Sequence, residues 1–369
     1  MIIKEKINNK ITNLVTTNLN TSPIVGNFFD HLDNLTTKCI SQLKINQLLE
    51  LQDFKMPLRV SFVRILDNIG GRLLLEYYLD DNNEKFWLFY LDTHLHHIGW
   101  ARNNSSYEYK LQVDVVEIVL SEYTVGNNMI IVDIFKNQQK FYSHRFQIGH
   151  MIEVLYENKF YIAHIVELLN EHHFKVKLHL VEDIYLYFTP TSQYIFPFKW
   201  CELNSLALEL PVDWCKDKCF NWDEYISLCN KNKTVFEDFL FVGADQSLFS
   251  SIIARHLTNI CEKYKLGSYL ECVNPLNLDE ICIGQIRLRV RHLLFIKIYS
   301  NSEQNLFIFT QNSFDLFPIG WSEMNNYKNF VLPIKFQNFC VEKSYFRSDI
   351  EKIPYLVKFN GNFVMATLY

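Results

Sequence analysis

Short apolar stretches that alternate with polar residues recur in three parts of the chain, and this period of two predicts β-strands. Polar turns separate the stretches, and Gly70 and Gly71 supply the positive φ that a tight hairpin needs. Because short antiparallel strands leave exposed edges, we expect each part to close into a small β-barrel and the fold to be mainly β. The stretches lie at 59–66, 72–79 and 86–92, then at 151–156, 160–180 and 185–189, and finally at 281–290, 293–300 and 306–310.

The three parts are copies of one repeat. Each ends in a similar motif, IGW, FPFKW or FPIGW, and asparagine follows four residues after each tryptophan. The tryptophans lie about a hundred residues apart, far beyond the roughly 20 to 50 residues of a solenoid repeat, so each copy is a small domain. Two copies open with a glycine four residues before Glu153 or Glu271, and we expect the first copy's opening to be eroded to 54–60. We expect the three tryptophans to lie at equivalent positions near the base of each barrel: Trp100, Trp200 and Trp321.

Helices are predicted between the barrels. Asn221 can cap a helix whose apolar side chains recur every three or four residues from Trp222 to Cys229. The segment 113–123 fits either a helix or a strand. The predicted division is an arm at 1–50, a first barrel at 51–105, a second repeat at 106–205 with its barrel from about 148, a third repeat at 212–335 with a helical arm at 219–263 and its barrel from about 266, and a tail at 336–369.

Composition and charge narrow the class of protein. Of the 369 residues, 49% are hydrophobic and 15% aromatic, which suits many short strands. The net charge of −5 lacks the basic footprint of a nucleic-acid-binding protein, so we expect no direct nucleic-acid binding. Nine scattered cysteines indicate a reducing compartment. No stretch approaches the roughly 18 apolar residues of a membrane span, so we expect an intracellular protein without membrane contact.

Several motifs resemble a known family. NIGGRLLLEY at 68–77, followed by FWLFYLDTHLHHIGW at 86–100, resembles the second repeat of the Scm-like proteins with four malignant-brain-tumour (MBT) domains, the Sfmbt family. FNWDEYISLCNK at 220–231 resembles the arm of that family's last repeat, and GSYLECVNPLNLDEICIGQI at 267–286 resembles its opening strands. The resemblance implies that the chain holds the family's second to fourth repeats without its first. It also implies that the tail begins a truncated further domain.

The resemblance also implies a binding chemistry. Barrels of this family are similar to readers of mono- and dimethyl-lysine, in which aromatic faces and one carboxylate surround the cation. The family's pattern is Asp-x-x-Asn on one loop and Phe, Trp and Tyr around the next, and no repeat here keeps it whole. In the first repeat Tyr77 stands at the position of the pattern's Phe, but Glu84 stands where its Tyr should be. In the second, Tyr185 matches but Tyr156 replaces the aspartate. The candidate methyl-lysine-binding residues of the third repeat are Asn274, Asn277, Tyr299 and Phe307.

By resemblance, the expected function is that of a nuclear, chromatin-associated component of transcriptional repression, of the Polycomb-group type, which binds histone tails through degenerate aromatic cages. The alternative is a protein-interaction scaffold that holds a sequence-specific DNA-binding repressor protein and reads no methyl-lysine.

Metal and catalytic sites have less support. Cys215, Cys219 and Cys229 could suggest zinc, but no fourth ligand completes a tetrahedral set. The family resemblance extends over the histidines at 94–97, which implies packing rather than metal binding. There is no P-loop, no G-x-S-x-G motif and no Cys–His pair in a recognisable context. We therefore expect no enzyme, no cofactor and no metal.

Overall fold

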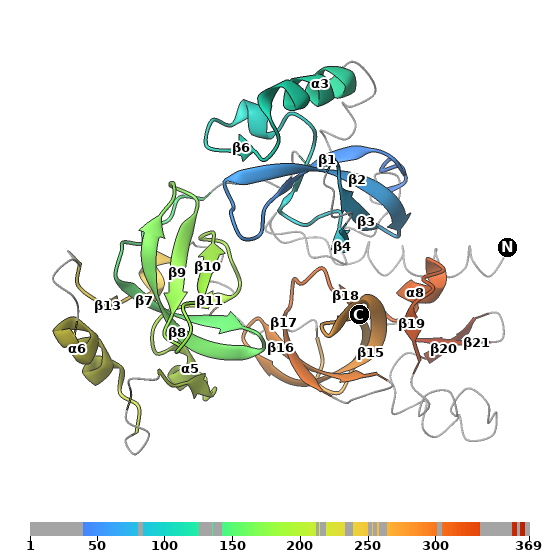
Figure 1. Cartoon of the computed structure of the whole chain (residues 1–369). Coiled ribbons are helices and arrows are strands. Elements are labelled where there is room, and N and C mark those ends of the chain that lie inside the picture. Colours follow the sequence, from blue (N-terminus) through green and yellow to red (C-terminus); the bar gives the residue numbers. More distant parts are fainter. Residues whose placement is uncertain are drawn as a thin grey trace, which may run out of the picture.

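The chain forms three lobes around a common centre (Figure 1). Each lobe is one mostly antiparallel sheet, and helices lie outside the sheets. The expected mainly β fold of three repeats is confirmed. The computed structural model describes residues 40–79, 84–124, 135, 142–211, 214, 219–232, 239–249, 253, 257, 264–300, 305–332, 356–359 and 362–365.

The three sheets share one strand order. The first consists of β1 (Leu48–Gln52), β2 (Arg59–Ile69), β3 (Arg72–Tyr77), β4 (Lys85–Phe89), β5 (Leu95–His96) and β6 (Glu108–Tyr109). Its order is β4-β3-β2-β1-β5, and β6 pairs in parallel with β2.

The same order recurs twice. The second sheet consists of β7 (His150–Tyr156), β8 (Lys159–Leu168), β9 (Phe174–Leu178), β10 (Tyr185–Phe188), β11 (Ile195–Phe196), β12 (Leu208–Glu209) and β13 (Val242–Gly243). The third consists of β14 (Tyr269–Asn274), β15 (Asn277–Val290), β16 (Leu293–Tyr299), β17 (Leu306–Thr310), β18 (Leu316–Phe317) and β19 (Phe330–Val331). Their orders are β10-β9-β8-β7-β11 and β17-β16-β15-β14-β18, and β12 and β19 take the place of β6.

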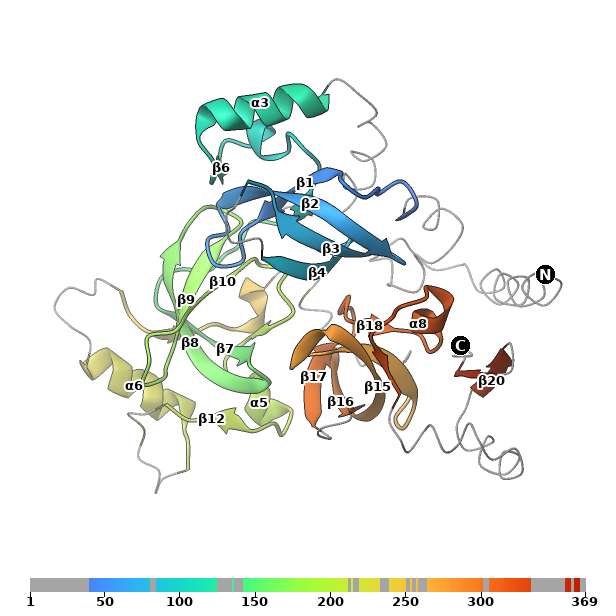
Figure 2. The ribbon, with the colours of Figure 1, turned by 45° about the vertical axis from the view of Figure 1, so that its right-hand side comes forward.

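The sheets are strongly curled, as the third lobe shows in Figure 2, and apolar clusters fill the curled sheets and continue from one repeat into the next. Among the described residues the hydrogen-bonded path ends at two edge strands in each sheet and does not close on itself. The turn between β2 and β3 is the expected tight hairpin, since Gly70 and Gly71 have φ of 58° and 90°.

The first repeat opens earlier than expected. β1 pairs with both β2 and β5, and Glu50 lies opposite Phe62, just as Glu153 lies opposite Ile162. The expectation of an opening eroded to 54–60 is therefore wrong. All five residues of β1 are buried, so the strand lacks the alternation that identifies a half-buried strand in sequence. β1 also crosses the boundary placed at residue 51, and the division into domains otherwise remains a prediction.

Two helices pack on the sheets that precede them in the chain. The segment left open as helix or strand is the helix α3 (Val113–Thr124), whose Val116 and Leu120 pack against the first repeat. The expected helix α6 (Trp222–Asn232) is confirmed, with the amide of Glu224 donating to Asn221 Oδ1 at 3.0 Å. It packs on the second repeat. None of the helices in the described part of the chain is long and apolar enough to cross a membrane.

The repeats close into a ring through their first hairpins. At the boundary of the first and second repeats, Gln52 Nε2 lies 3.1 Å from His173 Nε2. At the next boundary, Asn158 Nδ2 in the β7–β8 turn donates to the carbonyl of Leu306 at 2.8 Å. The ring closes where Arg72 of the first repeat donates to a carbonyl of β15 in the third.

A separate two-stranded sheet in the tail consists of β20 (Leu356–Phe359) and β21 (Asn362–Met365).

Candidate functional site

The three repeat-ending tryptophans are buried at equivalent places. Their exposed fractions are 8% for Trp100, 4% for Trp200 and 3% for Trp321. Each indole packs against a ring of the short strand four residues before it, stacked in the first and third repeats and tilted in the second. The ring centroids are 3.5 Å apart for His96 and Trp100, and 4.2 Å apart for Phe317 and Trp321. The tryptophans thus anchor the chain segment that leads away from each sheet.

A buried glutamate fixes the backbone beside each tryptophan. Glu50 accepts from the amides of Gly99 and Ala101 at 2.6 and 2.8 Å. Glu271 accepts from the corresponding amides of the third repeat at the same distances, and Glu153 accepts from the amide of Cys201 at 2.7 Å. Burial raises the pKa of each glutamate to about 7. The glycine-to-glutamate spacing was visible in the sequence, but its structural role was not.

The polar loop of the third repeat holds a carboxylate that the sequence interpretation missed. Asn274 Nδ2 donates to Glu280 Oε2 at 3.1 Å, and Asn277 Nδ2 donates to Glu280 Oε1 at 2.9 Å. The two predicted amides are therefore brought together by one partly buried acid. The only signal in the sequence was an acid three residues beyond the second asparagine, on the strand that follows the loop.

The two predicted aromatic residues of this site are not brought together. Tyr299 clusters with Ile283 on one face of the third sheet. Ile296 stands three residues before Tyr299 on the same strand. Phe307 lies opposite Ile296 and belongs to the apolar cluster on the other face. Side chains three apart on a strand point to opposite faces. Tyr299 is also 5% exposed and lies 5.5 Å from Lys297 Nζ.

The first repeat also keeps an acid at the position of the family's aspartate. Three residues after the buried glutamate of each repeat stand Asp53, Tyr156 and Asn274. The carboxylate of Asp53 accepts from the backbone amides of Lys55 and Met56 at 2.7 and 2.9 Å. Asp53 was missed because the opening of this repeat was placed after it.

In the first two repeats the chain's own lysines lie over the matching tyrosines. Lys110 Nζ is 5.7 Å from the ring centre of Tyr77, and Lys175 Nζ is 4.8 Å from that of Tyr185. A cation within about 6 Å of a ring centroid engages the ring. A methylated lysine would therefore have to displace an internal cation to use these faces.

The histidines with ligand-like spacing point to separate partners. His94 Nδ1 lies 2.8 Å from Asp92 Oδ1, His96 is buried against Trp100, and His97 Nδ1 lies 2.9 Å from the carbonyl of Ile98. In the described part of the chain, no three or more candidate ligands gather closely enough for a metal ion. The described cysteines are free thiols, and Cys215 lies outside the described residues.

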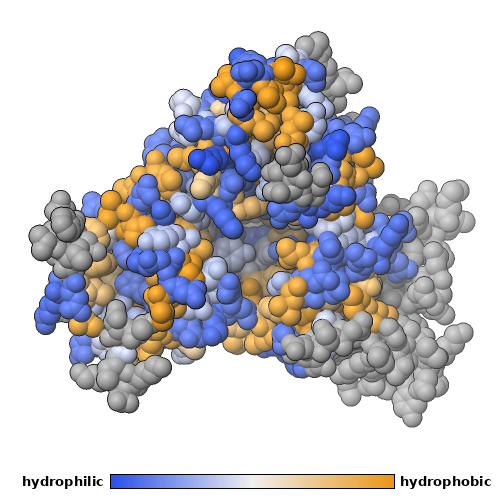
Figure 3. Space-filling model, viewed as in Figure 1, coloured by the Kyte–Doolittle hydropathy of each residue, from blue (hydrophilic) through white to orange (hydrophobic). Residues whose placement is uncertain are grey.

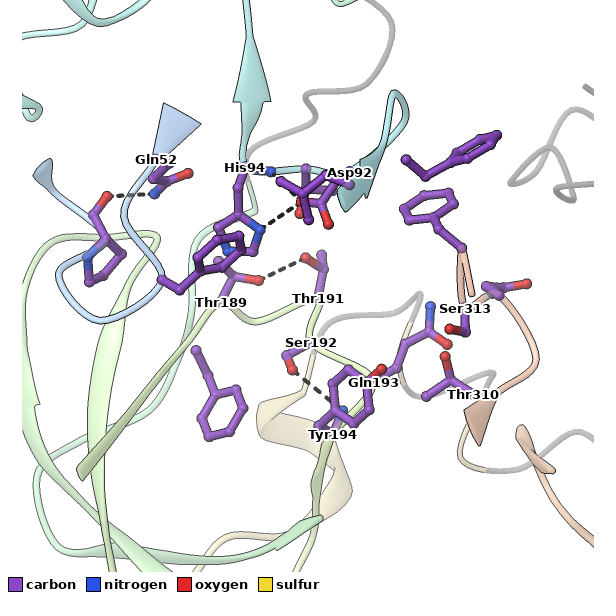
Figure 4. A pocket seen from close by; sticks show the side chains of 18 of the residues that line it. Gln52, Asp92, His94, Thr189, Thr191, Ser192, Gln193, Tyr194, Thr310 and Ser313 are labelled. Carbon is purple, nitrogen blue, oxygen red and sulfur yellow. Dashed lines mark hydrogen bonds and ion pairs between the residues drawn. The ribbon is translucent and has the colours of Figure 1, made fainter. Parts of the chain in front are cut away.

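A cavity of about 640 Å³ occupies the centre of the ring. Three equivalent loops line it, each running from the fourth strand of a sheet toward the repeat's tryptophan: 89–94, 189–194 and 310–315 (Figure 4). Figure 3 shows the corresponding hollow between the three lobes, with polar surface at its centre. The Asn274–Glu280 loop reaches the cavity wall through Leu278, but Asn274, Asn277 and Glu280 are not among the residues that line it.

The fold and the repeated motifs define a protein of tandem MBT repeats. A family model described as "mbt repeat" matches residues 47–113, 151–216 and 268–329, together more than half of the chain. The chain belongs to the MBT-repeat family.

Within this family it is similar to the Scm-like proteins. It is 26% identical over 298 residues to "Scm-like with four MBT domains protein 1" of Mus musculus, covering 76% of this chain and 32% of that protein. It is also 26% identical over 312 residues to Scm-like with four MBT domains protein 2 of Mus musculus, and this match covers 78% of this chain and 31% of that protein. The chain thus spans about a third of the length of these relatives.

Its fold is similar to a crystal structure of the four MBT repeats of Drosophila melanogaster Sfmbt, solved in complex with the peptide RHR(me)KVLR. The TM-score is 0.62 at 20% identity, and the match covers 87% of this chain and 74% of that one.

Proposed function

We propose that this chain is the histone-tail-binding part of a chromatin-associated component of transcriptional repression in the nucleus. Membership of the MBT-repeat family supports this role, as does the methylated-lysine peptide bound to the similar Drosophila domain. The observation that carries the proposal is the carboxylate of Glu280, which is held by Asn274 and Asn277 on the loop where the family pattern has Asp-x-x-Asn.

The chemistry of this loop suits a cation. A methylated ammonium keeps its charge but loses N–H donors, so it binds best to a carboxylate with aromatic faces around it. Glu280 supplies the charge that the amide of Asn274 cannot. The aromatic wall is thin, since Tyr299 and Phe307 face opposite sides of the sheet. Each missing cation–π contact removes about 0.5 to 2 kcal/mol, so we expect weak binding.

A histone-peptide array probed with the chain tests the proposal. We expect selective signals for mono- or dimethylated lysine peptides over unmodified ones, and expect Glu280→Gln to remove them. Asp279→Asn changes an exposed neighbouring acid and should leave the signals unchanged. If Asp53→Asn removes the signals while Glu280→Gln does not, binding belongs to the first repeat and the assignment to the third is wrong.

The second candidate is a scaffold for a sequence-specific DNA-binding repressor protein. The lysines over Tyr77 and Tyr185 favour it, because they fill the faces that a methyl-lysine would need. An array with no methylation-dependent signal from a folded chain would favour the scaffold over the reader.

A tagged copy of the chain tests the nuclear assignment. We expect the fluorescence of the tag to lie in the nucleus. We also expect the tagged chain to co-sediment with chromatin. A protein found outside the nucleus, or secreted, would contradict the chromatin role under either candidate.

A further inference from the structure

The boundary between the first and second sheets is built differently from the other two boundaries of the ring. One apolar cluster joins Leu293 of the third sheet to the core of the second, and another joins Phe317 of the third sheet to the core of the first. Within the described part of the chain, no apolar cluster contains strands of both the first and the second sheet. The contact across this boundary is polar instead, between Gln52 at the end of β1 and His173 just before β9, which are 6% and 4% exposed. This boundary is therefore the most sensitive to a change of charge.

The hydrogen bonds around this contact fix which atoms carry protons. Gln52, at the wall of the central cavity, donates from Nε2 to the carbonyl of Pro57 at 2.6 Å, so this end of its amide is the NH₂ group (Figure 4). Because an NH₂ group only donates, His173 Nε2, which lies 3.1 Å away, must accept. Asn170 Oδ1 accepts from the backbone amide of His173 at 2.8 Å, and the ring of His173 donates to the same oxygen from Nδ1 at 3.2 Å. The ring is therefore neutral, with its proton on Nδ1.

Protonation of His173 is incompatible with this contact. A proton on Nε2 turns the acceptor into a donor, so two N–H groups would face each other across the boundary. Burial opposes the charge as well and, together with the charges of neighbouring histidines, lowers the pKa of His173 to about 4. The ring therefore stays neutral while the boundary is closed and takes up a proton more readily when the boundary opens.

The carboxylates near His173 are engaged by other rings. Asp92 Oδ1 of the first repeat lies 2.8 Å from His94 Nδ1. Glu171 Oε1 of the second repeat lies 3.3 Å from His172 Nε2. These two acids can compensate a charge on the flanking histidines, whereas the partners of the His173 ring are the uncharged side chains of Gln52 and Asn170.

The other titratable groups that face the ring do not stabilise its charge either. The ring of Tyr107 meets that of His173 edge-on, with the centroids 6.1 Å apart, and its phenol is neutral because burial raises its pKa to about 12. The charges of His172, His94 and His144 each oppose protonation of His173. A proton on this ring is therefore stabilised only by water, which reaches it when the boundary opens.

We infer that the boundary between the first and second repeats is a pH-sensitive switch: protonation of His173 releases Gln52, and the two repeats separate along the wall of the central cavity, to which both side chains belong. The other two boundaries stay closed because their apolar clusters carry no titrating contact of this kind. This inference does not rest on the proposed histone function, since neither residue belongs to the Asn274–Glu280 loop.

The sign of the pH dependence follows from the two states of the ring. Closure of the boundary lowers the pKa of His173 from 6.5 to about 4, so the open state binds the proton more tightly. The stabilisation of the closed boundary is fully present above pH 6.5 and is lost as the pH falls from 6.5 to about 4. In that range the equilibrium constant for opening rises by up to about tenfold per pH unit, or about thirtyfold between roughly pH 7.5 and pH 5.

Hydrogen exchange of the full chain, measured by mass spectrometry from about pH 7.5 to pH 5 and corrected for intrinsic exchange rates, tests the inference. The reporters are two amides at the boundary. The amide of Gln52 donates to the carbonyl of His94 at 2.8 Å, and that of Leu169 donates to the carbonyl of His173 at 3.0 Å. We expect their protection to fall by about tenfold or more over this range. The amide of Ile308, which donates to Asn158 Oδ1 at the next boundary, should keep its protection.

Three variants identify the group responsible. His173→Gln keeps an acceptor oxygen for Gln52 but cannot titrate, so we expect it to abolish the fall in protection. Gln52→Glu places a carboxylate against the ring, and its charge favours the protonated histidine. We expect protection in this variant to rise as the pH falls, while the lost bond to Pro57 lowers it at every pH. His97→Gln, at a histidine whose Nδ1 lies 2.9 Å from the carbonyl of the next residue, is the matched control and should behave as the wild type.

The inference is overturned if boundary protection in the wild type does not change with pH, if the fall persists in His173→Gln, or if the Ile308 amide shares it. Should His173→Gln not fold, the sign of the pH dependence in Gln52→Glu decides the matter. A fall in that variant as large as in the wild type would show that His173 does not control the boundary.

Discussion

At the scale of single residues, the molecule depends on a glutamate and a tryptophan in each repeat. The glutamate is almost fully buried and accepts from at least one backbone amide, and the tryptophan packs against the ring four residues before it. A carboxylate presents two acceptor oxygens and no donor, whereas an amide side chain presents one acceptor oxygen and an NH₂ donor. Glu50 and Glu271 use both oxygens in this way, each accepting from two backbone amides, whereas Glu153 accepts from the amide of Cys201 through Oε2.

These glutamates predict a stability that depends on pH. The pKa of Glu271 is raised from 4.5 to about 7, so the folded state holds its proton more tightly than the unfolded state. Its contribution is fully present below pH 4.5 and is lost as the pH rises through 7, by up to about 3 kcal/mol. Urea unfolding at pH 5 and pH 8 measures this difference. We expect Glu271→Gln to reduce it, and identical pH profiles of the two proteins would contradict the account.

The tryptophans predict a large loss of stability on truncation. Trp321 is 3% exposed and stacks on Phe317. We expect Trp321→Ala to lower the free energy of unfolding by about 3 to 5 kcal/mol. Met324→Ala, at a position 76% exposed on the same short helix, should change it by less than about 0.5 kcal/mol. An unchanged melting temperature for Trp321→Ala would show that the indole does not support the fold.

Residue patterns could identify the tryptophans but not the aromatic wall of the binding site. The repeated endings place Trp100, Trp200 and Trp321 without reference to strand register. Tyr299 depends on register, because a shift of one residue moves a side chain to the other face of a sheet. The strands β2, β8 and β15 each contain a bulge, and Leu75, Val176 and Ile296 pair with the residue just before it. These three residues therefore hold equivalent positions in their repeats. Tyr299 therefore corresponds to Tyr78, and Ile298 holds the place of Tyr77.

At the scale of elements, tertiary packing decided what local pattern left open. The valine-rich segment of α3 has side chains that suit strands, yet Val116, Val119 and Leu120 follow a helical spacing that buries them against the first sheet. β1 was missed for the opposite reason, because a strand buried on both faces shows no alternation. Neither outcome could be derived from the segment alone.

The hairpins that join the repeats predict a local effect. Asn158 donates to the carbonyl of Leu306 at 2.8 Å and accepts from the amide of Ile308 at 2.5 Å. We expect Asn158→Ala to speed hydrogen exchange of the Ile308 amide and to cost about 1 to 2 kcal/mol of stability. Asn232→Ala, at the exposed end of α6, is the matched control and should change neither. Unaltered exchange at Ile308 would show that this hairpin does not hold the second and third repeats together.

At the scale of the whole molecule, three weakly similar repeats form one ring, and their loops carry different polar side chains. The bases of the repeats keep the same glutamate and tryptophan, whereas the loops differ: Asp53, Tyr156 and Asn274 hold one position, and His94, Tyr194 and Asp315 hold another. The ring closes the central cavity, so loops far apart in sequence meet there. Motif spacing predicted three units but could not predict that their loops converge.

We propose that this MBT-repeat chain binds histone tails weakly through the Glu280 loop. Titration of mono- and dimethyl-lysine histone peptides against the wild type, Glu280→Gln and Asn274→Asp tests it most directly. We predict a wild-type Kd in the roughly millimolar range, weaker binding by Glu280→Gln, and tighter binding by Asn274→Asp because a second carboxylate joins the first. Micromolar wild-type binding that neither substitution changes would contradict the claim.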